Sequence, residues 1–173
     1  MAPLRALNYD SLRDVVYYAS AGGFAATSDI RVGCHAILIP RLTPFYGFER
    51  QGVVYVWLCM PYDSAPACRI FTEVTSVFFQ PLRDLGVHLT QYLDDRLACH
   101  ESRAVAKAEN LLIRNLLAAL GWYVSLDTCD LLPVQLLRFL GLTIDFVRGV
   151  FSVPANKLAA ILTPTRRGHC KPR

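Results

Sequence analysis

Two adjacent carboxylates, Asp94 and Asp95, follow a mostly apolar run over residues 87–93, and no other feature constrains the chain as strongly. The run predicts a strand that enters a tight turn, with both carboxylates at its tip. Because neighbouring like charges repel, and because burial raises a carboxyl pKa, both groups stay ionised mainly where a cation lies beside them. An isolated Asp-Asp pair is more often a solvated turn, but here a third acid, Asp29, also ends an earlier apolar segment. Hard divalent ions that take oxygen ligands, above all Mg²⁺, suit such a set.

The composition is that of a globular domain. The chain has 173 residues, of which 53% are hydrophobic and 18% charged, enough for one domain with its own core and unlike a disordered segment. Part of the net charge of +4 lies in residues 166–173, so the charge alone does not predict a polyanion as partner. The six cysteines lack C-x-x-C spacing, which argues against a zinc site. With no signal peptide and no apolar run near membrane length, we expect an intracellular protein of the cytoplasm or nucleus, without a membrane partner.

Hydrophobic periodicity predicts alternating helices and strands. Helices are predicted over residues 8–19 (capped by Asp10 or Ser11), 64–85 (capped by Asp63 or Ser64), 101–120 and 155–162. Strands are predicted over residues 24–30, 96–99, 122–126, 136–144 and 150–153, with a hairpin over residues 46–58. The predicted core face of the third helix consists of Val105, Ala108, Leu111, Leu112, Asn115, Leu116 and Ala119.

The order of these elements contains a central β-α-β-β-α-β run, which is the ferredoxin-like, or split βαβ, pattern. The predicted fold class is therefore α+β, an antiparallel sheet with helices packed on one face. In that fold the strand that ends at Asp29 lies beside the turn that carries Asp94 and Asp95. The sequence thus predicts that three carboxylates converge.

Several segments resemble, in order and spacing, the sequence boxes of reverse transcriptase palm domains, especially those of LTR or tyrosine-recombinase retrotransposons. Residues 92–95 (Tyr-Leu-Asp-Asp) resemble the Tyr-x-Asp-Asp box, and residues 28–35 resemble the first acidic box. Residues 47–49, 60–62 and 69–72 resemble the family's Gly-Phe-Glu, Leu-Pro-Phe-Gly and Phe-Thr segments, and residues 139–142 its Phe-Leu-Gly primer-grip hairpin. The resemblance implies the ferredoxin-like polymerase palm.

The resemblance also implies an activity, RNA-directed DNA polymerisation by two-metal nucleotidyl transfer to a primer 3′-hydroxyl. The cofactor would be two Mg²⁺ ions, with Mn²⁺ as a substitute, and the partners would be an RNA or DNA template with primer and deoxynucleoside triphosphates. The implied catalytic and metal-binding residues are Asp29, Asp94 and Asp95. The implied substrate-binding residues are Ile30, Arg31, Gly33, Cys34, Tyr62 and Asp63, and the implied primer grip is Phe139, Leu140 and Gly141.

Two of these positions depart from the family pattern. Cys34 stands where the family has a bulky aromatic residue that blocks a ribose 2′-hydroxyl, which implies poor discrimination against ribonucleotides. Asp63 stands where the family has a glycine, and its carboxylate would add a negative charge close to phosphates.

The resemblance also predicts how the chain is divided. Only 28 residues precede Asp29, where the family carries a fingers region. We therefore expect a palm over residues 1–153 with the fingers largely absent, and the start of a thumb helix with a basic tail over residues 154–173. Such a fragment would lack the fingers, most of the thumb and the RNase H domain of a parent polyprotein, and would be weakly active or inactive alone. The alternative is a non-catalytic palm-fold relic that binds nucleic acid or protein.

Overall fold

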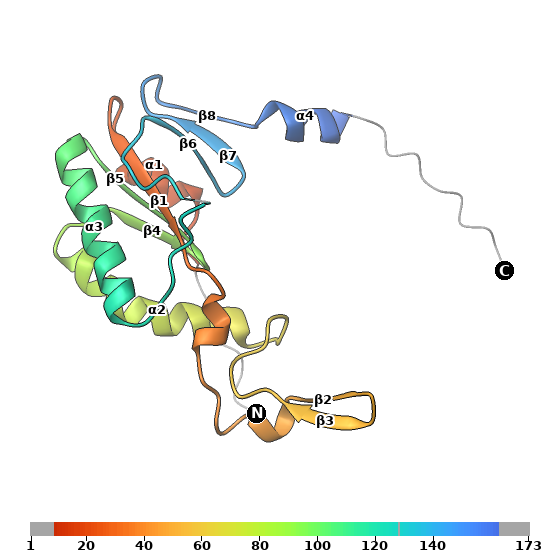
Figure 1. Ribbon diagram of the computed structural model, residues 1–173. Helices are drawn as coiled ribbons and strands as arrows, with labels where there is room; N and C mark the ends of the chain where they lie inside the picture. The colour runs from red at the N-terminus through yellow and green to blue at the C-terminus, as the bar shows by residue number, and fades with distance from the viewer. Residues whose placement is uncertain (1–8, 128, 163–173) are drawn as a thin grey trace.

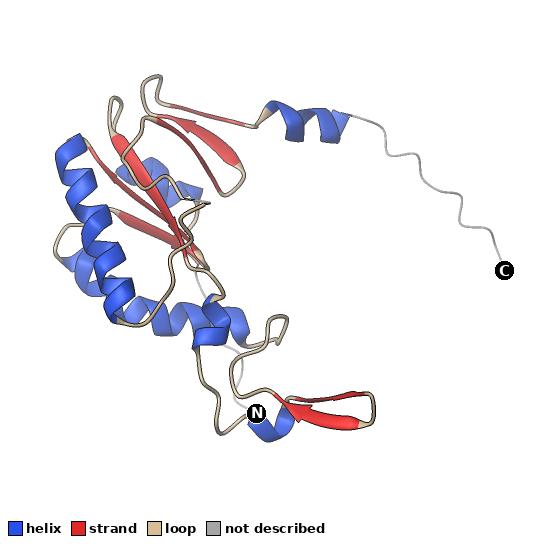
Figure 2. Cartoon of the chain, in the orientation of Figure 1, coloured by secondary structure: helices blue, strands red, loops and turns tan. Residues whose placement is uncertain are grey.

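The computed structural model describes residues 9–127 and 129–162, so the expected basic tail lies outside the described residues from position 163 onward (Figure 1). At its centre is a three-stranded antiparallel sheet in the order β1–β5–β4, made of β1 (Phe24–Asp29), β5 (Asp95–His100) and β4 (Leu89–Tyr92). Helices α2 (Ala67–Asp84) and α3 (Arg103–Ala119) pack together on one side of it (Figure 2). This is the α+β, ferredoxin-like palm arrangement that the sequence predicts.

The sheet separates two hydrophobic layers, because successive side chains of its central strand point to opposite faces. Ala98 lies in the layer under α2 and α3, whereas Leu97 and Cys99 lie in the other layer. The second layer is closed by α1 (Leu12–Tyr18) and by a small antiparallel sheet of β6 (Leu136–Phe139), β7 (Leu142–Asp145) and β8 (Val150–Ser152). Helix α1 is therefore an exception to the expectation that the helices pack on one face.

The remaining elements project from this body. After two 3₁₀ helices, η1 (Gly33–Ala36) and η2 (Thr43–Phe45), comes the hairpin of β2 (Gly47–Arg50) and β3 (Val53–Val56). Every residue of its two strands is exposed. Figure 1 shows this hairpin and α4 (Ala155–Leu162) extending away from the sheet in different directions. No helix among the described residues is long and apolar enough to cross a bilayer.

Helix capping was predicted correctly for α1 and wrongly for α2. Ser11 accepts a hydrogen bond from the Arg13 amide at 3.2 Å, and the Asp14 carboxylate accepts one from the Ser11 amide at 2.6 Å, forming a capping box. Helix α2 instead begins after Pro66, which has no side chain that can cap it, and the Ser64 hydroxyl donates to the Met60 sulfur.

The strand predicted over residues 122–126 does not form. That segment follows the free edge of β1 through isolated bridges that pair Ile30 with Val124 and Ala25 with Val134. Between the two bridges lie nine residues of the irregular segment but only four of the β1 side, so the two cannot pair residue by residue in a continuous ladder.

The single strand predicted from periodicity over residues 136–144 is also wrong, because this segment is a hairpin, as the resemblance at residues 139–142 implies. Leu140 and Gly141 form its two-residue turn, and both have a positive φ, 46° and 80°. Such backbone angles belong to a turn that joins two twisted strands rather than to a strand interior.

The predicted core face of α3 is wrong as well. The buried residues are Ala106, Asn110, Ile113 and Leu117, whereas most of the predicted face is exposed. The helix carries apolar residues on more than one stripe, so periodicity alone does not choose between them. The Asn110 amide favours the observed face, because it donates a 2.8 Å hydrogen bond to the Leu131 carbonyl.

Candidate functional site

The turn between β4 and β5 holds Asp94 and Asp95 in place. Tyr92 and Asp95 form the last register pair of the two strands, so Leu93 and Asp94 are the two loop residues. Leu93 has a φ of 50°, an uncommon conformation for a bulky residue. The Asp94 carbonyl accepts hydrogen bonds from the Ile30 amide at 3.0 Å and from Arg96 Nη1 at 2.9 Å. These two bonds tie the turn both to the chain after β1 and to the strand that follows.

Asp29 lies opposite this turn. Asp29 and Asp95 are direct register partners across the antiparallel pair β1 and β5. The Asp29 amide donates to Cys129 Sγ at 3.0 Å, and its carbonyl accepts a 2.9 Å bond from the Ser125 amide. The structure thus places Asp29, Asp94 and Asp95 at the same end of the sheet, as the split βαβ pattern predicts.

The pKa values of Asp94 and Asp95 are both shifted by the charges around them. Burial raises the pKa of Asp94, the charges of Asp29 and Asp95 raise it further, and Arg96 opposes the shift. Partial desolvation and the Asp29 charge likewise raise the pKa of Asp95, again against Arg96. Asp94 Oδ1 is buried and has no hydrogen-bond partner. A cation beside this oxygen would relieve both the repulsion and the missing contact.

Arg96 is the residue of this site that sequence reasoning missed. It belongs to the inner face of β5, is only 1% exposed, and its guanidinium lies 4.9 Å from the centre of the Phe79 ring. Burial lowers its pKa to about 10, although the charges of Asp94, Asp29 and Asp95 favour its charged form. Its Nε and Nη2 atoms have no hydrogen-bond partner. The available signal in the sequence was a charged residue within the mostly apolar strand predicted over residues 96–99.

The donor set has the chemistry of a divalent cation site, but not a preformed geometry. Carboxylate oxygens suit Mg²⁺ or Mn²⁺, and the orphaned Asp94 Oδ1 is a ligand atom without a partner. As the side chains stand, no three His, Cys, Asp or Glu residues within 9–127 and 129–162 are arranged to hold a metal ion. The residue types fit the ion, and their side chains would have to close around it.

Three of the predicted substrate-binding residues lie near Asp94. A Cβ atom on Gly33 would lie 2.6 Å from Asp94 Oδ1 and 2.5 Å from the Phe71 ring, so only glycine fits beside that carboxylate. Burial, with the Asp94 charge, raises the pKa of the Cys34 thiol to about 11. Burial and the charges of Asp94, Cys34 and Asp29 raise the pKa of Tyr62.

The other three predicted substrate-binding residues differ in exposure. Ile30 is buried and contributes its amide to the Asp94 turn, whereas Arg31 is exposed. Asp63 is exposed and has a φ of 64°, a backbone conformation that glycine adopts more easily. Next to it, Tyr62 packs edge-on against His35, with 4.5 Å between ring centres.

The predicted primer grip forms the β6–β7 hairpin on the other face of the sheet. Phe139 is buried with Val15 and Leu97, and Leu140 packs against the same cluster. Gly141, in the turn, lies against the end of the Lys157 side chain. The structure gives this hairpin a packing role, and its contact with a primer stays a prediction.

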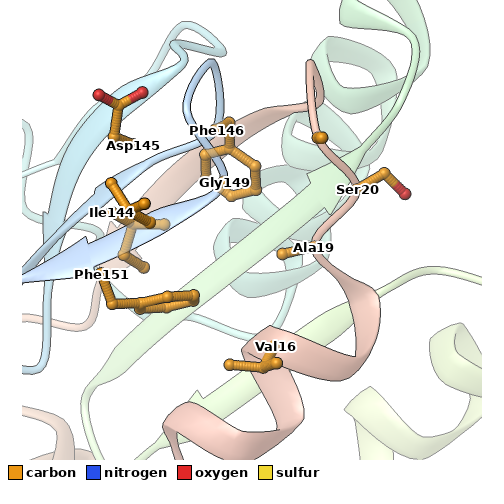
Figure 3. A pocket seen from close by; sticks show the side chains of 10 residues that line it. Val16, Ala19, Ser20, Ile144, Asp145, Phe146, Gly149 and Phe151 are labelled. Atoms are coloured by element: carbon orange, nitrogen blue, oxygen red, sulfur yellow. The ribbon is translucent and has the colours of Figure 1, made fainter.

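A small pocket of about 100 Å³ lies apart from the carboxylates, between α1 and the β7–β8 hairpin. Figure 3 shows Val16, Ala19, Ile144 and Phe151 around it, all of them apolar. Asp145 is its only carboxylate, and none of the predicted site residues lines it.

Asp95→Asn is expected to raise the free energy of unfolding at neutral pH by roughly 0.2–1 kcal/mol, because it removes one of two like charges opposite each other in a sheet. The folded-state pKa of Asp95 is raised, so the folded protein binds a proton more readily than the unfolded chain. Its ionisation therefore lowers stability as pH rises, and this penalty vanishes below the ordinary Asp pKa of about 3.9.

Urea denaturation at pH 7 and at about pH 4 measures this effect, which should shrink at the lower pH. Glu49→Gln is the control, because Glu49 lies on the exposed hairpin opposite Val54 and not opposite a carboxylate. An equal gain from both substitutions would contradict the prediction.

No family model matches the chain, and no curated protein does. Solved structures match it across nearly its whole length. Foamy viral protease-reverse transcriptase in complex with dsDNA has a TM-score of 0.79 at 19% identity, over 94% of this chain and 33% of that chain. The same viral enzyme in complex with an RNA/DNA hybrid has a TM-score of 0.75 at 20% identity, over 92% of this chain and 21% of that chain. The chain therefore has a reverse-transcriptase-like fold and spans a third or less of these two proteins.

Proposed function

We propose that this chain is the palm of an RNA-directed DNA polymerase of a retroelement, of the LTR or tyrosine-recombinase type. One observation carries the proposal: Asp29 and Asp95 are register partners, with Asp94 in the adjoining turn, within a fold shared with viral reverse transcriptases. The reaction is transfer of a deoxynucleotide from its triphosphate to a primer 3′-hydroxyl. The type of retroelement rests on the sequence boxes alone.

Asp29 and Asp94, with Asp95, would hold two Mg²⁺ ions, or Mn²⁺ in their place. Such ions, when bound, lower the pKa of the primer hydroxyl and neutralise charge on the triphosphate. The chain's own residues supply the positioning. The Ile30 amide and Arg96 hold the Asp94 turn, and Gly33 leaves space beside the Asp94 carboxylate.

Residues around Asp94 would form the nucleotide side of the site. Arg31 offers an exposed cation for the triphosphate, and Tyr62 lies near the carboxylates. Cys34 leaves more room beside a ribose than an aromatic side chain would, so ribonucleotides should be poorly excluded. Asp63 adds an exposed negative charge to this rim.

The proposed partners are a primer-template of RNA or DNA and deoxynucleoside triphosphates. Support comes from matching proteins whose structures hold dsDNA or an RNA/DNA hybrid. Because the chain spans only part of those proteins, we propose that fingers, thumb and RNase H functions lie in other parts of a parent polyprotein.

Primer extension on an RNA template tests the proposal. The wild-type protein should extend a primer with Mg²⁺ or Mn²⁺ and not with EDTA, though only weakly because it spans only part of the matching polymerases, and Asp94→Asn should not extend it. Asp84→Asn is the matched control, since Asp84 is exposed at the end of α2 and its Oδ1 accepts a bond from Gln80 that asparagine can keep.

No extension by a folded wild-type protein would overturn the polymerase proposal. Salt-sensitive affinity for primer-template that is independent of metal would then indicate the alternative, a palm-fold relic that binds nucleic acid.

A further inference from the structure

We propose that Arg96 is the internal counter-cation of the carboxylate site, holding Asp94 in position and weakening the attraction of the site for divalent cations. The inference rests on the proposed function, because it concerns the same three carboxylates. It assigns to this chain a positioning residue that the sequence boxes do not include.

The burial of Arg96 calls for compensation that its hydrogen bonds do not provide. An arginine that is 1% exposed loses nearly all its hydration, which is tolerated when charges of opposite sign lie close by. Its one hydrogen bond runs from Nη1 to the Asp94 carbonyl, while Nε and Nη2 have no partner. Asp94, Asp29 and Asp95 all favour its charged form. The nearby carboxylates, together with the Phe79 ring, are therefore what stabilises the buried charge.

The residues paired with Arg96 in the sheet carry no negative charge that would call for a cation beside them. Its register partners on the two sides are Ser28 and Gln91, both neutral and buried. The Gln91 amide donates instead to the Thr75 hydroxyl of α2. Among the described residues, the interactions that account for a cation at this position are thus those with the carboxylates and with the Phe79 ring.

The buried charge of Arg96 lowers the net negative charge that a divalent ion encounters at the carboxylates. Three ionised carboxylates carry three negative charges, and the fixed charge of Arg96 leaves a net two. The Arg96 guanidinium is buried and hydrogen-bonded to the Asp94 carbonyl, so it repels an incoming dication more strongly than a surface arginine would, because water screens it less. Removing the charge without enlarging the space should strengthen cation binding about tenfold.

The test is titration of the full chain with Mn²⁺ at about pH 8, with free Mn²⁺ measured by electron paramagnetic resonance. Arg96→Met removes the charge at similar volume, and Arg96→Gln removes it while keeping a donor for the Asp94 carbonyl. Arg96→Lys keeps a positive charge. Arg103→Met makes the same change in net charge on an exposed residue beyond the far end of β5.

Both neutral variants should bind Mn²⁺ about tenfold more tightly than the wild type, with the Lys variant and Arg103→Met within about twofold of it. Their melting temperatures should also rise more on adding Mn²⁺ than that of the wild type.

Unchanged or weaker Mn²⁺ affinity in the neutral variants would overturn the proposed role of Arg96. Mn²⁺ binding and primer extension by the wild type would still support the polymerase proposal. Absence of Mn²⁺ binding in every variant overturns both proposals. If neither neutral variant folds even with Mn²⁺, Arg96 is a structural residue only, and the inference is wrong.

Discussion

Phe71→Ala is expected to lower the free energy of unfolding by about 3–5 kcal/mol, the usual effect of removing a buried aromatic ring. Phe71 is 1% exposed and packs edge-on against Trp122, with 5.5 Å between ring centres. A Cβ atom placed on Gly33 would lie 2.5 Å from its ring and 2.6 Å from Asp94 Oδ1, so the ring and the carboxylate flank the same glycine. A cavity here would loosen the core and the support of the carboxylate site together. Urea denaturation followed by circular dichroism measures the loss.

Phe45→Ala is the matched control, because the same atoms are removed from a side chain that is 80% exposed. It should change stability by less than about 0.5 kcal/mol. A loss below about 1 kcal/mol for Phe71→Ala would show that the layer under α2 and α3 is not packed as the structure has it.

The sequence predicts best where local chemistry and tertiary contacts agree. The Ser11 cap needs only its own helix, and the hairpin over residues 46–58 needs only its own backbone; both were found as predicted. The position of Asp29 opposite Asp95 followed from the order of elements, because the split βαβ pattern leaves one arrangement for the first and third strands.

Predictions failed where a distant partner decides. On α3, two apolar stripes compete, and contacts with β1, β5 and Leu131 select the stripe of Ile113 and Leu117. Along the edge of β1, residues 122–126 had strand-like composition, but the segment between the two bridges has the wrong length for a continuous ladder. Both outcomes depend on how separate segments fit together, which periodicity does not encode.

Arg96 was missed for a different reason. A charged residue in a short apolar strand looks like an ordinary exposed position until the register shows that it faces α2 rather than solvent. Its buried charge is also stabilised only once Asp29 of β1 and Asp94 of the β4–β5 turn lie nearby, and the sequence alone does not show this proximity. Like charges gathered at one site lower the stability of the fold. Here the positive charge of Arg96 offsets part of the repulsion among the carboxylates.

Asp29→Asn is expected to reduce primer extension about 10³-fold, which corresponds to roughly 4 kcal/mol of lost transition-state stabilisation. Asparagine has nearly the same shape, so the β1–β5 pairing should persist while one charged ligand is lost. Single-turnover extension with Mn²⁺ measures the rate, and Mn²⁺ affinity should fall in parallel. Asp84→Asn, the same chemical change at an exposed position, should leave both unchanged.

The direction of the pKa shifts excludes an indirect explanation for such a loss. The Asp29 charge raises the pKa of both Asp94 and Asp95, so removing it lowers both values and leaves the remaining carboxylates more fully ionised at neutral pH. Protonation of these neighbours therefore cannot account for lost activity in Asp29→Asn. Titration of the Asp95 carboxyl by ¹³C NMR should show its midpoint moving to lower pH in the variant. Extension at the wild-type rate, together with this lowered midpoint, would mean that Asp29 shapes the charge of the site without acting as a ligand in the reaction.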